Sequence, residues 1–157
     1  MLLQFFEAMN ASAMSVVIRD SLWMVGIINA SHLLCVVMFI GAVLMVDLRL
    51  VAADSGNPPL AEVARDAHPW LIAALIGLTV TGIPQIMTNA LREYHSYLFW
   101  MKMTVLCVAL IHTFTLRRKV AHAEHGVAPA TRRAVGAVSI ALWIAVLIPA
   151  RLIGLFT

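Results

Sequence analysis

The chain has 157 residues, of which 62% are hydrophobic and 12% are charged. Soluble domains have roughly 45–50% apolar and about 25% charged residues, and a chain this short cannot bury the excess in a core of its own. The composition therefore excludes an ordinary water-soluble domain and predicts an integral membrane protein. The net charge of +3 does not indicate a nucleic acid partner, because the basic residues cluster in one loop, which is a topology signal.

Residues 1–20 precede the first long apolar run. They lack the basic start and the continuous apolar core of a signal peptide. Apolar side chains recur in them at loose helical spacing, among them Leu2, Phe6, Met9 and Val17. We expect an amphipathic helix that lies at the membrane interface. The alternative is a ragged first turn of the helix that follows.

Four later segments are apolar over about the 20 residues that a membrane span needs. They cover residues 22–46, 69–87, 97–116 and 135–156. Pro69 suits the first turn of a helix, whereas Pro84 and Pro149 predict a kink or a helix end. We therefore predict an all-α fold: a four-helix up-down bundle in the membrane, forming a single domain over residues 1–157.

The loops predict the orientation of this bundle. The loop between the third and fourth segments is the most basic, with Arg117, Arg118, Lys119, Arg132 and Arg133. Loops rich in lysine and arginine stay on the cytoplasmic side. Because the chain crosses four times, we expect both termini on the opposite, outer side.

Ionisable side chains inside a membrane are costly, so each is a functional hypothesis. Those that fall in or beside the predicted spans are His32, His68, Lys102, His112 and Arg151. With a helical rise of about 1.5 Å per residue, His32 and Lys102 lie at one level of the bundle. His68 and His112 approach a second level, nearer the cytoplasmic face.

Histidines that face each other across a four-helix scaffold are a common way to hold haem. His32, His68 and His112 are the candidate iron ligands. Lys102 and Arg151 are alternative ligands or partners for the haem propionates. Glycines would leave room for the flat porphyrin, namely Gly26, Gly41, Gly77 and Gly82. The alternative is that small residues permit close helix packing and that the imidazoles bond to neighbouring helices.

Two further polar features are weaker indications of a functional site. Asp47 ends the first apolar run, and we interpret it as a charged stop at the interface. His122, Glu124 and His125 lie in one loop and form a possible metal site, although a solvated polar loop is the simpler interpretation. The sequence contains no pattern of a nucleophile triad, a phosphate-binding loop or a catalytic carboxylate pair.

Five stretches carry a family resemblance: Ser21-Leu-Trp through His32-Leu-Leu, Val46-Asp-Leu-Arg-Leu50, His68-Pro-Trp70, Phe99-Trp-Met-Lys-Met103 and Ala150-Arg-Leu-Ile153. They resemble an uncharacterised bacterial family of four-helix membrane proteins, a domain of unknown function. This resemblance implies the inner membrane of a bacterium, and the outer side that the loops predict for both termini is then the periplasm.

The pattern of His32 and Lys102 is similar, more remotely, to two other families. One is the four-helix membrane protoporphyrinogen oxidases, which bind haem b, and the other is the copper-resistance protein D family. The first likeness implies that His32 and Lys102 are the matching site positions, and His112 departs from it.

We therefore expect a b-type haem protein that moves electrons between membrane quinones and a protein partner on the periplasmic side. The sequence leaves open whether it is an enzyme, as the redox membrane subunit of an oxidoreductase. The alternative is a non-catalytic membrane subunit or anchor of a larger complex, because the loops are small. Copper transport, suggested by the nine methionines, ranks last because these residues form no regular stripe.

Overall fold

The computed structural model describes the backbone of residues 1–52, 59–123 and 126–156, and their side chains as far as Ala150. In this part of the chain, four helices are long and apolar enough to cross a membrane. They are Leu22–Ala52, Leu60–Thr88, Tyr97–His122 and Pro129–Ala150. The predicted all-α fold class is confirmed.

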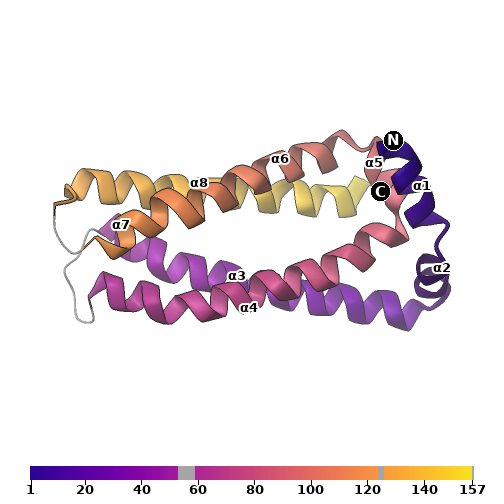
Figure 1. Ribbon diagram of the computed structural model, residues 1–157, viewed down its shortest axis with the longest axis horizontal. Helices are drawn as coiled ribbons and strands as arrows, with labels where there is room; N and C mark the ends of the chain where they lie inside the picture. The colour runs from indigo at the N-terminus through magenta and orange to yellow at the C-terminus, as the bar shows by residue number, and fades with distance from the viewer. Residues whose placement is uncertain (53–58, 124–125, 157) are drawn as a thin grey trace.

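The elements follow one another as an up-down bundle. In chain order they are α1 (Leu2–Asn10), α2 (Ala13–Asp20), α3 (Leu22–Ala52), α4 (Leu60–Thr88), α5 (Ala90–His95), α6 (Tyr97–His112), the π-helix η1 (Thr113–Arg117), α7 (Arg118–His122) and α8 (Pro129–Phe156). Figure 1 shows that successive long helices alternate in direction and that both termini lie at one end. We call this the α5 end, and the opposite end the α7 end.

The helices pack in a definite order around the bundle. α3 packs against α4 and α8, α6 packs against α8, and α7 packs against α4. The outer surface of the long helices carries exposed apolar side chains, such as Leu34, Ile76, Ile111 and Ile144. Such a surface suits lipid rather than water.

Glycines set the close approach of α3 and α4. A Cβ atom on Gly77 would stand 2.6 Å from the sulfur of Cys35, and one on Gly82 would stand 3.4 Å from Cε1 of His32. Both glycines therefore serve helix packing, as small residues do in membrane bundles, and they leave no porphyrin-wide slot between α3 and α4. A Cβ atom on Gly26 or on Gly41 would meet no other atom within 4 Å.

The helices begin where predicted at Leu22 and Tyr97, but at the α7 end all four helices extend beyond the predicted boundaries, the third as far as His122. α3 continues to Ala52, α4 already begins at Leu60, and α8 begins at Pro129. The helices extend beyond their apolar segments because hydropathy marks the part of a helix that faces lipid and not the end of the helix.

The early start of α4 corrects the position predicted for His68 and Pro69. Both lie inside α4 instead of at its first turn. The carbonyl that Pro69 leaves without a helical partner belongs to Arg65, an exposed residue, where water can donate to it. Neither Pro84 nor Pro149 ends its helix.

The N-terminal segment forms two helices instead of the single one expected. Ser12 divides them, because its hydroxyl accepts from the Ser15 amide at 3.2 Å and donates to the Met9 carbonyl at 2.8 Å, as an N-cap residue does. Both helices pack across the α5 end, where Phe6 is buried beside the aromatic rings of Tyr94, Phe99 and Trp100. The turn expected between the second and third spans contains α5.

The contact of α8 with α3 yields a prediction about stability. A Cβ atom on Gly136 would stand 2.9 Å from the backbone oxygen of Asp47 and 2.9 Å from Cβ of Leu50. We expect Gly136→Ala to lower the free energy of unfolding by about 1–3 kcal/mol, the usual range for overpacking. Gly41→Ala is the matched control, because it meets open space. Thermal unfolding in detergent checks both, and equal midpoints for the two variants would contradict this packing.

Candidate functional site

The polar side chains inside the bundle lie at two levels, with an apolar layer between them. The layer is built from Phe39, Val43, Leu71, Ala109 and Trp143 with their neighbours. The rings of Phe39 and Trp143 meet at its centre, 4.7 Å apart. The two levels are therefore separate sites, one toward each end of the bundle.

The level toward the α7 end is organised by a buried ion pair. Asp47 is 0% exposed and Arg117 is 6% exposed. The Nε atom of Arg117 donates to Oδ1 of Asp47 at 2.5 Å, and its Nη2 atom donates to the Val43 carbonyl at 2.9 Å. Asp47 is thus an interior residue, which corrects the interpretation as an interfacial stop. Isolated buried charges are strongly unfavourable, so each member of the pair depends on the other.

Further polar atoms surround this pair and are not used by it. His112, on the same helical segment as Arg117, and Ser139 of α8 both interact electrostatically with the Asp47 carboxylate. Within the described residues, both ring nitrogens of His112, Oδ2 of Asp47 and Oγ of Ser139 are buried without a hydrogen bond. Buried polar atoms are rarely left in this state, so the site retains capacity to bond water or to exchange protons.

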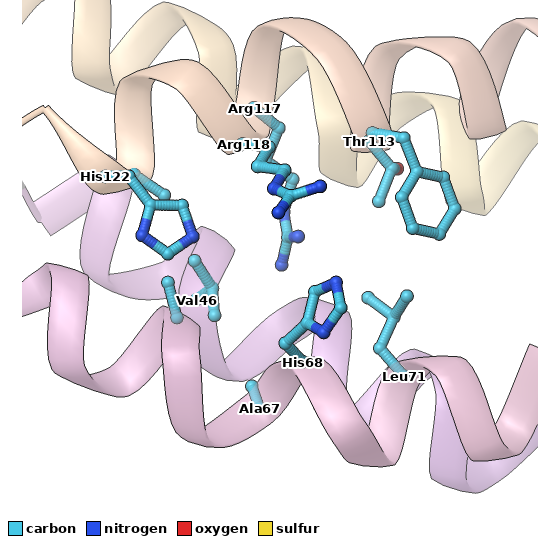
Figure 2. Close-up of a pocket in the computed structure, with 11 residues that line it drawn as sticks. Val46, Ala67, His68, Leu71, Thr113, Arg117, Arg118 and His122 are labelled. Atoms are coloured by element: carbon cyan, nitrogen blue, oxygen red, sulfur yellow. The ribbon is translucent and has the colours of Figure 1, made fainter.

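His68 lies near this level but on the other side of Arg117. It lines a cavity of about 30 Å³ together with Thr113, Arg117, Arg118 and His122 (Figure 2). Ligand pockets usually measure roughly 300–1,000 Å³. The cavity therefore has room for a small polar group and not for a porphyrin.

The level toward the α5 end is centred on His32. Its Nδ1 atom lies 2.8 Å from Oγ1 of Thr81. The Thr81 hydroxyl donates its single hydrogen to the Gly77 carbonyl at 2.7 Å, so it must accept from His32. In the neutral imidazole the proton therefore sits on Nδ1, and the lone pair is on Nε2.

Charged side chains lie beside His32. The ammonium group of Lys102 interacts electrostatically with His32 and with Glu93, so Lys102 lies in the same part of the bundle as these two residues. Burial raises the pKa of the Glu93 carboxyl, while Lys102 and Arg92 act in the opposite direction. Glu93 comes from α5, outside the spans, and links this level to the α5 end.

The predicted site residues are therefore only partly brought together. His32 and Lys102 are close enough to interact electrostatically, whereas His112 interacts with the ion pair and His68 lines the cavity. The side chain of Arg151 lies outside the described residues, as do Glu124 and His125. The residues that sequence reasoning missed as parts of a site are Asp47, Thr81, Arg117 and Ser139.

The ion pair yields a second prediction. Asp47→Asn leaves Arg117 buried without a counter-charge, and we expect the free energy of unfolding to fall by about 3–5 kcal/mol. Asp66→Asn, at an exposed position of α4, is the control. The double variant Asp47→Leu with Arg117→Met removes both charges, and we expect it to be more stable than Asp47→Asn. Denaturant unfolding in detergent decides, and an Asp47→Asn variant as stable as Asp66→Asn would contradict the assignment.

Comparisons with known proteins place the chain in a family but not beside any characterised relative. No curated protein and no solved structure matches it. A family model described as a family of unknown function matches residues 5–156, nearly the whole chain. The family resemblance of the sequence is thereby confirmed, and the chain belongs to the family of unknown function DUF6644.

Proposed function

We propose that this protein is a membrane redox subunit that binds a b-type haem, whose iron His32 would hold. The observation that carries the proposal is the hydrogen bond from Nδ1 of His32 to Thr81. Histidines that bind metals usually donate their other ring N–H to a neighbouring acceptor, which fixes the tautomer and the ring orientation. His32 has this arrangement, because Thr81 is itself fixed on the Gly77 carbonyl.

The packing of the helices limits where a haem can lie. Gly77 and Gly82 hold α4 closely against α3, so the ring does not fit between these two helices. The third span offers more freedom, because α6 packs mainly against α8. Among the described residues, neither α3 nor α4 packs closely against α6. We therefore place the haem between α3 and α6, at the level shared by His32 and Lys102.

The side chains around His32 have distinct tasks in this proposal. Lys102 offers either a propionate partner or, as a neutral amine, a second ligand. Glu93 balances the charge of Lys102. His68 and His112 rank below His32 as ligands, because the cavity beside His68 is too small for a porphyrin and His112 lies with the ion pair. Arg151 stays a candidate propionate partner.

A bound haem b supplies reversible one-electron chemistry. The chain contributes a dry, apolar surrounding and an oriented imidazole, and it holds a cation and a carboxyl near the α5 end. These are the properties needed to exchange electrons with a lipid-soluble quinone and with a protein partner at that face. The remote likeness of His32 and Lys102 to the haem-binding membrane oxidases points in the same direction.

The test is spectroscopic. The protein is expressed with haem supplied, purified in mild detergent, and its oxidised and dithionite-reduced visible spectra are recorded. We expect a Soret band and a sharp reduced α-band. His32→Ala should abolish both, whereas His68→Ala and His112→Ala should retain them. Thr81→Val should retain haem but shift its reduction potential, which a purely structural role of Thr81 would not do.

A flat spectrum of the wild-type protein would reject haem binding. The function that we would then favour is a non-catalytic membrane subunit or anchor. A specific observation favours this second candidate: the hydrogen bond of His32 and the packing of both glycines join α3 to α4, so His32 also serves helix packing. Proteins that co-purify in mild detergent would identify the complex.

We further propose that the protein lies in a bacterial inner membrane with the α7 end in the cytoplasm. The basic residues support this orientation, because Arg49, Arg65, Lys119, Arg132 and Arg133 all lie toward that end, where the positive-inside rule places them. Both termini are at the α5 end (Figure 1) and are therefore periplasmic. The quinone and the protein partner would be reached from this side.

A fusion experiment checks the orientation. Alkaline phosphatase depends on disulfides that form in the periplasm, whereas green fluorescent protein serves as the cytoplasmic reporter. We expect an active phosphatase and a dark fluorescent protein when each is fused to the C-terminus. The opposite pair of results would reverse the topology.

A further inference from the structure

The cavity beside His68 lies between two segments that are far apart in the sequence. α4 forms one wall, with His68, Ala67 and Leu71, and η1 with α7 forms the other. Apolar side chains close its inner side, and the exposed Arg118 and His122 stand at its edge. The cavity is therefore a small pocket that opens toward the surface at the α7 end.

Hydrogen-bond donors converge on this cavity from both walls. Figure 2 shows the imidazole rings of His68 and His122 and the guanidinium groups of Arg117 and Arg118 around one space. The described residues that line the cavity include no carboxylate. Glu62 and Asp66 belong to α4 but are exposed and do not line it. The described lining thus carries two guanidinium groups that no carboxylate of the lining neutralises.

The donors are only partly used by the protein itself. Arg117 is committed through Nε to Asp47 and through Nη2 to the Val43 carbonyl. Within the described part of the chain, Arg118 and His122 make no hydrogen bond or ion pair. Two groups at the edge of the cavity can therefore donate to a bound acceptor without losing a bond to the described residues.

The π-helix η1 and the start of α7 carry two successive arginines, Arg117 and Arg118, to this cavity. A π-turn takes in one residue more than an α-turn, and such turns occur often at functional sites. In η1 both Thr113 and Arg117 point inward, at 2% and 6% exposure. Arg117 thereby reaches Asp47 in the interior while Arg118 faces α4. The ion pair with Asp47 fixes the position of Arg117 and thereby one side of the cavity.

We infer that this cavity binds a phosphate group, either as a small phosphate anion or as the phosphodiester of an anionic lipid headgroup. Arginine binds phosphate oxygens through its fork of N–H donors. Donors on opposite walls suit a tetrahedral anion, whose oxygens point in several directions, better than a planar carboxylate. The volume of about 30 Å³ admits a group of this size. Basic pockets between helices at the cytoplasmic side are known to take anionic lipid headgroups.

The inference goes beyond the proposed redox function and is tested separately from it. Delipidated full-length protein in detergent is titrated with inorganic phosphate, with phosphatidylglycerol, or with phosphatidylcholine at constant ionic strength, and thermal unfolding is recorded. Arg118→Gln is compared with Arg133→Gln. Both arginines are exposed and near the α7 end, but Arg133 does not line the cavity. Arg118 is exposed, so its replacement should not prevent folding.

We expect saturable stabilisation of the wild-type protein and of Arg133→Gln. The apparent affinity of Arg118→Gln should be at least about tenfold weaker, because a charge-assisted bond is lost. His68→Gln should weaken binding from the opposite wall. A response to phosphatidylglycerol but not to phosphate would assign the site to a lipid, and a response to phosphate would assign it to a small anion. The inference is overturned if neither anion stabilises the protein, or if Arg118→Gln and Arg133→Gln lose affinity equally.

Haem content keeps this test distinct from that of the redox proposal. Arg118→Gln should retain the haem spectrum of the wild-type protein, since His32 lies at the other level of the bundle. Phosphate binding in a protein without haem would leave the present inference standing, and haem without phosphate binding would reject it alone.

Discussion

The buried pair of Asp47 and Arg117 is the constraint on which the α7 half of the bundle depends. α3 and η1 do not pack closely along their backbones, and the long arginine side chain bridges them instead. α8 meets the same residue from another side, with Gly136 against the Asp47 backbone and Ser139 beside its carboxylate. Three of the four spans therefore converge on one aspartate. In lipid, where no water screens a charge, such a junction is specific because few other arrangements satisfy it.

The apolar layer around Phe39 and Trp143 separates two groups of polar residues in the bundle. On the α5 side of this layer, the neutral imidazole of His32, with one free nitrogen, lies near a single lysine, Lys102. On the α7 side lie the ion pair of Asp47 and Arg117 and the donors that line the cavity beside His68. Because the described residues of the layer are apolar, proton or anion chemistry at one level does not automatically reach the other. Thr113 lies at its lower boundary, where Trp143 donates to the Thr113 hydroxyl at 3.2 Å.

Hydropathy alone predicted the number of spans, their order and two of their starting residues, because the length of an apolar run is set by the bilayer. The same signal misjudged the α7 ends, where helices continue in polar sequence. Asp47 was missed although a signal existed: it follows Phe39 and Val43 at helical spacing, on the face that is buried. Its partner could not be found in this way, since Arg117 looks like one of several basic loop residues. The π-helix η1 that carries Arg117 has no pattern in a single sequence.

The placement of Phe6 has a consequence for how the chain is assembled. Its ring rests on Tyr94, Phe99 and Trp100, which are synthesised only after two spans have been made. The N-terminal helices must therefore wait at the membrane surface during translation. Their exposed side chains, such as Phe5 and Val17, suit them to remain in the headgroup region until then. Closure of the α5 end is thus a late step of biogenesis, and it depends on the third helix having entered the bilayer.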